Sequence, residues 1–256
     1  MNIENIETEW RESIPKFDCP TCEKGILNFE KKDIVELEDG ISKQCKILEL
    51  EPTYYSGKFT LSSKCTNPEC EETAIIVGKT SLVSNGWYSG GFDPEEGIEI
   101  PPHEMYKTLY KLELTEPAIQ LFNIPEKVSD KVRNKLKESF KLFWIDKSAC
   151  GNKIRASIEI LLDDLKVRKT RTKNRKRTKL TLHKRIELFK EKKSSLASNL
   201  LAIKWIGNSS SHGISNVSTR QIIDSYKILE YVLTNIYDIK ESEIKNLTKK
   251  INKRKR

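Results

Sequence analysis

The first hundred residues show the alternation of apolar and polar side chains that is typical of β-strands. Three segments, 45–55, 58–65 and 73–83, combine this alternation with β-branched and aliphatic residues. Turn signals lie before, between and after them, at Glu38-Asp39-Gly40, Ser56-Gly57, Asn85-Gly86 and Ser89-Gly90-Gly91. The pattern therefore predicts a small β-rich domain at the start of the chain.

From residue 125 onward, apolar residues recur every three or four positions, which is the period of helices that bury one face. Five helices are predicted. Their apolar stripes are Val128, Val132, Leu136, Phe140, Phe143 and Trp144; Ile154, Ile158, Leu161, Leu162 and Leu165; Leu182, Ile186 and Phe189; Leu200, Ile203 and Ile206; and Ile222, Ile223, Tyr226, Leu229, Val232, Leu233 and Ile236. We expect the first helix to run from Pro125 to about Cys150-Gly151, and the fourth from Leu196 to Ile206.

Prolines bracket the segment between these two patterns, at Pro101-Pro102 and at Asn123-Ile124-Pro125. Because proline opposes helix formation in itself and in the residue before it, we expect an extended connector there. The predicted fold class is α+β. Its parts are a β-rich domain with the connector at 1–124, a helical bundle at 125–240 and a basic tail at 241–256.

Charge separates the same two parts of the chain. Residues 1–124 contain 12 Lys or Arg and 23 Asp or Glu, a net charge of −11, whereas residues 125–256 contain 34 and 14, a net charge of +20. The total of +9 hides this asymmetry. A surface so rich in positive charge is typical of proteins that contact nucleic acid, although a solvated basic surface remains the alternative.

One run of 14 residues, 166–179, contains nine basic residues and no acidic one. The nine are Lys166, Arg168, Lys169, Arg171, Lys173, Arg175, Lys176, Arg177 and Lys179. Mutual repulsion is expected to keep the run mobile. It can be a nucleic-acid-binding loop, in which each neutralised phosphate releases counterions, or a solvated loop between helices. The density of charge favours the first interpretation.

Four of the six cysteines form two closely spaced pairs. Cys19 and Cys22 have the spacing C-x-x-C, Cys65 and Cys70 have C-x-x-x-x-C, and a proline lies within each turn. Four thiolates on two such turns are typical of a structural zinc site that leaves no position open for a substrate. We therefore predict a zinc cofactor. The alternatives are four reduced cysteines without metal and, for one ligand position, substitution by His103.

The segment Leu200–Gly213 is the clearest candidate for chemistry. Its apolar stripe ends at Gly207 and three serines, and Asn208 and His212 are four residues apart, on one face of any continuing helix. Histidine transfers protons near neutral pH. The alternative is structural, with Asn208 bonded to a buried backbone group and His212 near the helix end that Gly213 terminates.

These features together resemble a HEPN-like bacterial family of unknown function. The resemblance rests on the helix Ile154-Arg155-Ala156-Ser157-Ile158-Glu159, on the segment IKWIGNSSSH at 203–212 and on the cysteine module before them. It covers roughly residues 10–240 and is clearest at 150–212. It implies a helical bundle that pairs with a second copy as a homodimer. It also implies association with restriction-modification and anti-phage defence genes.

Many HEPN proteins are metal-independent RNases, and the resemblance implies roles for individual residues. His212 matches the histidine that transfers protons, and Asn208 matches the polar position of the motif. The motif's arginine position holds Gly207, which cannot stabilise charge in a transition state. Lys204 or Arg155 is the candidate replacement for that cation.

Three functions remain open from the sequence. The first is a non-catalytic or weakly catalytic module of a prokaryotic defence system, which binds RNA, DNA or a partner protein from the same locus. The second is a HEPN-type RNA endonuclease that uses His212. The third is a protein-interaction scaffold that binds no nucleic acid.

The beginning of the chain, MNIENIETEWRE, lacks the basic start and apolar core of a secretory signal. No apolar run approaches the roughly 18 residues that a membrane span needs. We therefore expect a cytoplasmic protein without membrane contacts. In that compartment cysteines stay reduced and paired cysteines more often bind metal than form disulfides.

Overall fold

The structure is a computed structural model, and the chain in it divides into two compact units. The N-terminal unit comprises residues 2–120 and the C-terminal unit residues 121–256. The described residues are 6, 10–85, 92–93, 95, 97–99, 104–173, 175–191, 193–211, 217–237, 248 and 250–252. Sheets form the first unit and helices the second, so the predicted α+β class is confirmed.

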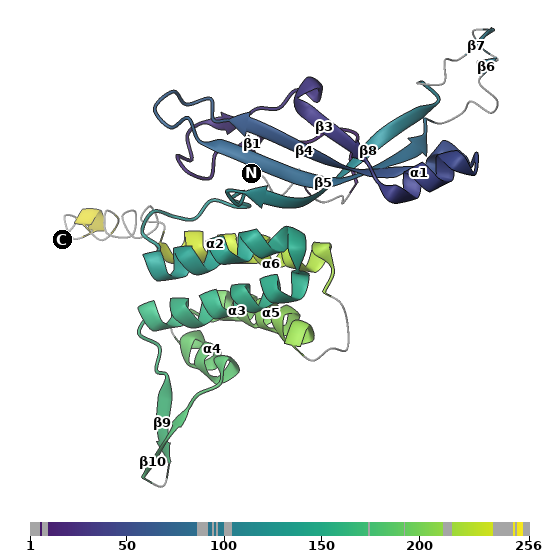
Figure 1. Ribbon diagram of the computed structural model, residues 1–256. Coiled ribbons are helices and arrows are strands. Elements are labelled where there is room, and N and C mark those ends of the chain that lie inside the picture. Colours follow the sequence, from purple (N-terminus) through teal and green to yellow (C-terminus); the bar gives the residue numbers. More distant parts are fainter. Residues whose placement is uncertain are drawn as a thin grey trace. The chain divides into compact units, whose positions relative to one another are not determined.

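A four-stranded antiparallel sheet forms the centre of the N-terminal unit (Figure 1). Its strands, in spatial order, are β3 (Ile34–Glu38), β4 (Ser56–Lys64), β5 (Thr73–Ser84) and β8 (Tyr106–Glu116). Alternate residues of β4 are buried, including Phe59 and Leu61, as the period of two requires. The strands predicted at 58–65 and 73–83 are thus confirmed as β4 and β5.

Smaller elements complete this unit. They are the paired strands β1 (Phe17–Asp18) and β2 (Ile26–Leu27), the paired strands β6 (Phe92–Asp93) and β7 (Ile98–Glu99), the short 3-10 helices η2 (Lys31–Asp33) and η3 (Pro52–Tyr54), and helix α1 (Gly40–Ile47). The first cysteine turn connects β1 to β2.

The strand predicted at 45–55 is wrong, because α1 and η3 occupy that segment. Asp39 starts α1: its side chain accepts a hydrogen bond from the Ser42 backbone N–H at 2.9 Å, which satisfies a free donor of the first turn. The alternating apolar residues that suggested a strand do not face a core. Ile47 is 80% exposed and Leu48 is 67% exposed.

The predicted extended connector is also more ordered than expected. Residues Tyr106–Glu116 form β8, which pairs with β5 along its length. The register shifts where Val77 and Gly78 of β5 pair with Leu114 and Leu112 of β8, so Glu113 of β8 is the extra residue of a bulge. Gly78 is needed there because a Cβ on it would lie 2.1 Å from the Lys111 carbonyl oxygen and 2.5 Å from the Phe59 ring.

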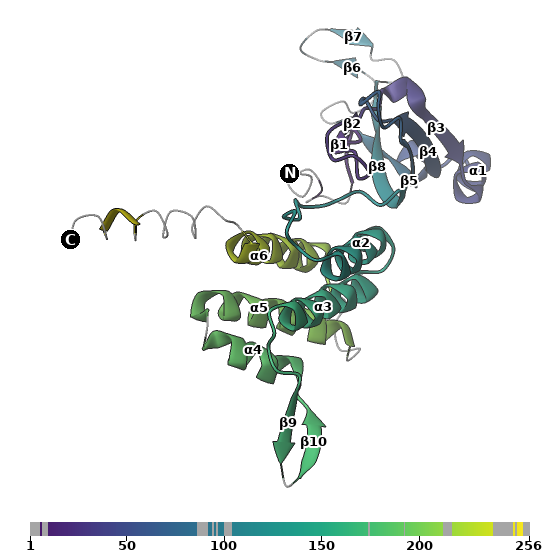
Figure 2. The same ribbon diagram turned by 90° about the vertical axis from the view of Figure 1, so that its left-hand side faces the viewer.

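In the described part of the C-terminal unit, the labelled elements are five helices and a hairpin (Figure 2). They are α2 (Asp130–Ile145), α3 (Lys147–Asp164), the strands β9 (Thr170–Lys173) and β10 (Lys176–Lys179), α4 (Leu182–Lys190), α5 (Ser194–Ser211) and α6 (Thr219–Tyr237). Helix α3 contacts α2, α4, α5 and α6, so it is the central helix of the bundle. All five predicted helices exist, although several boundaries differ.

The break between the first two helices lies at Asp146, not at Cys150-Gly151 as predicted. Asp146 accepts a hydrogen bond from the Ala149 N–H at 2.9 Å and thereby caps α3. Likewise, α2 begins after Ser129, whose hydroxyl accepts from Val132 N–H, and not at Pro125. The fourth predicted helix, α5, is longer than expected at both ends.

The core of the bundle is an aromatic cluster around Tyr226. Phe122, Phe140 and Phe143 lie with ring centroids 5.7, 5.3 and 6.2 Å from the Tyr226 ring. The Tyr226 hydroxyl donates to Ser139 Oγ at 3.0 Å and lies 3.1 Å from the Cys150 sulfur. Every polar atom of this buried ring therefore has a partner, as burial requires.

Within the described residues, no helix combines the length and apolar character needed to cross a membrane.

Candidate metal centre and nucleic-acid interface

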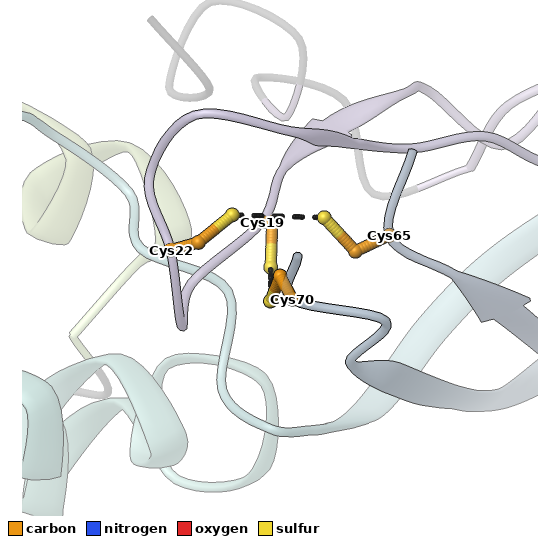
Figure 3. A group of neighbouring side chains, drawn as sticks. All are labelled: Cys19, Cys22, Cys65 and Cys70. Atoms are coloured by element: carbon orange, nitrogen blue, oxygen red, sulfur yellow. Dashed lines mark hydrogen bonds between the residues drawn. The ribbon is translucent and has the colours of Figure 1, made fainter. Parts of the chain in front are cut away.

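The four paired cysteines meet in the N-terminal unit (Figure 3). Cys19 Sγ lies 3.9 Å from Cys70 Sγ, Cys22 Sγ lies 3.6 Å from Cys65 Sγ, and all four sulfurs lie within 4.8 Å of one another. A tetrahedral site with metal–sulfur bonds of 2.3 Å requires sulfurs about 3.8 Å apart. A disulfide requires about 2.05 Å, and all four cysteines are free. The cluster therefore has the dimensions of a metal site.

Two similar turns position these sulfurs. In the first, Cys19 N–H donates to the Gly25 carbonyl at 2.8 Å and Gly25 N–H donates to Cys22 Sγ at 3.3 Å. In the second, Asn67 N–H donates to Cys65 Sγ at 3.4 Å. Backbone amides that point at sulfur stabilise thiolate ligands. Each predicted cysteine pair therefore lies in a turn that stabilises one of its thiolates.

Backbone pairing joins the two turns. Leu27 pairs with Cys65 in an isolated antiparallel bridge, and Thr66 N–H donates to the Ile26 carbonyl at 3.0 Å. The two cysteine pairs, which 42 residues separate in the sequence, are therefore held together by strand β2. This explains how ligand pairs with such a long separation can form one site.

Gly25 is a residue of this site that the sequence pattern did not single out. A Cβ on Gly25 would lie 2.3 Å from Cys65 Sγ and 2.9 Å from Asn67 N, so no side chain fits. The available signal was its position, three residues after the second cysteine of the C-x-x-C pair. Close approach of one turn to the other requires glycine there.

The thiols differ in acidity. The Gly25 and Lys24 backbone N–H groups lower the pKa of Cys22 to about 6, because they stabilise its thiolate. Burial raises the pKa of Cys65 to about 12. A divalent cation offsets that burial cost by coordinating the thiolate directly. Four sulfur ligands fit zinc or another soft cation, and they leave no coordination position for a substrate.

The basic run at 166–179 is folded, which corrects the expectation that charge keeps it mobile. Its two strands pair antiparallel, with Lys173 opposite Lys176 and Thr170 opposite Lys179. Arg175 lies in the connecting turn with φ of 61°. Threonine favours extended backbone, and two unit charges 4 Å apart repel by only about 1 kcal/mol in water. Repulsion between solvated side chains therefore does not prevent the hairpin.

Charge is exposed along this hairpin. Eight of the nine basic side chains of the run are exposed, namely Lys166, Arg168, Lys169, Arg171, Arg175, Lys176, Arg177 and Lys179. The ninth, Lys173, has a side chain outside the described residues. Among described residues, Lys169 is the member of the run that pairs with a carboxylate, 2.7 Å from Asp163. The remaining cations are available to an anionic ligand.

A buried arginine anchors the base of the hairpin to the bundle. Arg185 of α4 is 7% exposed at its side chain and donates to Asp163 Oδ1 at 2.6 Å. It also donates to the carbonyls of Glu159 at 3.1 Å and Val167 at 3.2 Å. Val167 lies three residues before the start of β9, so these bonds tie α3, α4 and the base of the hairpin together. No sequence signal marked Arg185 for this role.

The structure describes only some of the predicted catalytic residues. Helix α5 includes Lys204 and Asn208, but the side chain of Asn208 and the whole of His212 lie outside the described residues, as does His103. Lys204 is 8% exposed, and its Nζ lies 3.8 Å from the centroid of the neighbouring Trp205 ring. Arg155 Nε lies 3.8 Å from a Glu159 carboxylate oxygen. The proposed grouping of these residues stays a prediction.

Two family models match the chain, one in each unit. Residues 8–96 are similar to a family described as a domain of unknown function (DUF8608), and residues 137–254 to a second domain of unknown function (DUF4145). No curated protein and no solved structure matches the chain. The metal site and the basic hairpin therefore lie in two segments that each match a family of unknown function.

Proposed function

We propose that this chain is a nucleic-acid-binding module whose basic hairpin contacts phosphates. The observation that carries the proposal is the β9–β10 hairpin, which in both views extends away from the helices of its unit (Figures 1 and 2). Eight exposed cations lie on or beside it, and one of them pairs with a described carboxylate. Such a concentration of positive charge is not needed for packing, since the cationic side chains described on the hairpin are exposed.

Phosphate binding accounts for the concentration of positive charge on the hairpin. Each cation that neutralises a phosphate releases condensed counterions, which provides affinity that does not depend on base sequence. The fold also fixes where the charge is presented, because Arg185 and the pair Lys169–Asp163 hold the base of the hairpin. An ordered and projecting cationic element loses less conformational freedom on binding than a mobile tail does.

The remaining assignments rest on this proposal and on sequence resemblance. We assign zinc to the four cysteines as a structural ion, supported by the spacing of their sulfurs and by the closed set of four ligands. The bundle would be HEPN-like and dimeric, and the protein would serve a prokaryotic defence system. These statements are supported by the Gly-Asn-x-x-x-His pattern at 207–212 and the cysteine module.

The experiment compares three forms of the full chain for binding to labelled nucleic acid at low salt. A hairpin-neutral variant carries five changes to glutamine, at Arg171, Arg175, Lys176, Arg177 and Lys179. A charge-matched control carries five changes to glutamine at exposed positions elsewhere in the C-terminal unit, at Lys127, Lys131, Lys141, Lys190 and Arg220. We expect the first to lose binding and the second to retain most of it. Equal loss in both would contradict the proposal, because binding would then follow total charge.

Zinc is tested separately by metal analysis of freshly purified protein. We expect about one zinc ion per chain, lost on Cys65→Ser and kept on Cys45→Ser, because Cys45 is a buried cysteine outside the cluster. Less than half an equivalent of any metal in the unaltered protein would contradict the assignment.

A second candidate function, an RNA endonuclease, is favoured by one observation. Helix α5 continues to Ser211, which places Lys204 and Asn208 on successive turns, and Lys204 is 8% exposed. A buried cation stabilises developing negative charge more strongly than an exposed one. The test is cleavage of RNA without added metal, and His212→Ala should then lower the rate at least about 100-fold while His183→Ala does not. Cleavage that survives His212→Ala would exclude this mechanism.

A further inference from the structure

The hairpin carries cations on both of its faces. In an antiparallel pair, residues opposite each other lie on the same face, so Arg177 and Lys179 share a face with Thr172 and Thr170. Arg171 and Lys176 lie on the other face, where Arg171 is opposite Thr178. Each of these four basic side chains is exposed. We name the first pair the 177/179 face and the second the 171/176 face.

A ribbon that rested flat on a nucleic acid would use cations on one face only. Thr172 on one face and Thr178 on the other are both exposed, so neither face is covered by the bundle. Charge on both faces is suited to a ligand that surrounds the ribbon with phosphates on two sides. A groove between two phosphate backbones has that form.

The dimensions of the hairpin suit one groove in particular. Each strand has four residues and therefore spans about 13 Å, and the exposed Arg175 lies at the tip. The major groove of B-form DNA is about 12 Å wide and about 8.5 Å deep, and it admits a two-stranded ribbon. The major groove of A-form RNA is too deep and narrow for side chains to enter. We propose that the β9–β10 hairpin inserts into the major groove of double-stranded DNA.

This inference rests on the proposed nucleic-acid binding and specifies its ligand. Arg177 Nε donates to Thr170 Oγ1 at 2.9 Å, an interaction that an incoming phosphate or base edge can replace or share. Threonines alternate with the cations along β9, and Thr178 lies between two cations of β10; their hydroxyls supply further donors to phosphate oxygens. Arg175 at the tip is the residue placed to reach a base edge, where arginine binds guanine through two hydrogen bonds.

The test uses the full chain and two variants that each remove two charges. Arg177→Gln with Lys179→Gln alters one face, and Arg171→Gln with Lys176→Gln alters the other. Affinity for one duplex DNA is measured over a range of salt concentrations. Insertion predicts that each double variant reduces the slope of log affinity against log salt by about two, because each lost phosphate contact accounts for about one. A loss confined to one face would overturn the inference.

Two further measurements separate the possible failures. DNA duplex should bind more tightly than RNA duplex or single strands of the same sequence, and equal binding of RNA duplex would overturn insertion. Arg177→Lys together with Arg171→Lys keeps the charge and should keep the salt slope, and a slope that falls as far as in the glutamine variants would overturn phosphate contact by these cations. Failure of the hairpin-neutral variant to weaken any binding would instead overturn the proposed function itself.

Discussion

At the scale of single residues, a few side chains determine whether each site can form. Gly25 permits the two cysteine turns to approach, and Arg185 holds the base of the hairpin. In the bundle core, Tyr226 links Cys150 of α3 to Ser139 of α2 through its hydroxyl. Each of these residues has a specific contact that substitution removes or blocks.

Gly25→Ala should weaken the metal site. The added Cβ would lie 2.3 Å from Cys65 Sγ, so the sulfur or the backbone of Asn67 must move. We expect lower metal affinity and a loss of about 1–3 kcal/mol in the free energy of unfolding of this unit. Gly40→Ala is the matched control, because a Cβ there meets nothing within 4 Å. Unchanged metal affinity in Gly25→Ala would show that the turns are less closely packed than described.

Tyr226→Phe should destabilise the bundle. Burial raises the pKa of Tyr226, so the hydroxyl stays protonated and donates to Ser139 while it accepts from the Cys150 thiol. Removal leaves the Cys150 thiol without this partner and takes one donor from Ser139 Oγ, which still donates to the Leu136 carbonyl, and should cost about 1–2 kcal/mol in denaturant unfolding. Tyr231→Phe, at a ring that is 54% exposed, should change stability by about 0.5 kcal/mol or less. Similar values for the two variants would contradict the role of the network.

At the scale of elements, the sequence predicted the strands and helices whose apolar residues recur with a regular period. It did not predict boundaries that depend on a single contact. Strands β4 and β5 follow an alternation that matches their buried face, and the pair Arg155–Glu159 follows from helical spacing. The segment 45–55 was misread because apolar residues such as Ile47 are exposed there. The break before α3 depends on the Asp146 cap. The prediction placed it at Cys150-Gly151 because glycine often ends a helix.

The sites show the same division. Cysteine spacing predicted all four members of the cluster, because ligand pairs are local in sequence. The folded state of the basic run was missed because its charges suggested mobility, whereas its threonines and two-residue turn support a hairpin. Arg185 could not be found, since its partners Asp163 and Val167 are brought to it only by the packing of α3 against α4.

Arg185→Met should loosen the base of the hairpin. The change leaves Asp163 and two carbonyls without their buried donor, and breaking such a pair costs about 3 kcal/mol. Denaturant unfolding measures this loss, and amide hydrogen exchange should become faster in β9 and β10. Lys184→Met removes an exposed pair with Glu187 on the same helix and should cost about 0.5 kcal/mol or less. Unaltered exchange in the hairpin of Arg185→Met would contradict the anchoring role.

At the scale of the whole molecule, two units with their own cores carry the two sites. The cysteine turns connect β1 and β2 to β4 in the N-terminal unit, whereas the C-terminal unit has its own aromatic core around Tyr226. Metal removal should therefore act on one unit. After chelation, amides of β4 and β5 should exchange faster while those of α3 stay protected, because bound metal contributes folding free energy only where its ligands lie. Protection of β4 and β5 that survives complete removal of metal would contradict a structural role for the ion.

The most direct test of nucleic-acid binding by the hairpin is the salt dependence of affinity for duplex DNA. It is measured on the unaltered chain and on the hairpin-neutral variant with its five changes to glutamine. If four of these cations neutralise phosphates and Arg175 reaches a base edge, the slope of log affinity against log salt should be less steep in the variant by about four, at about 0.9 per phosphate. Equal slopes for the two proteins would contradict the proposed function, because the cations of the hairpin would then play no part in binding.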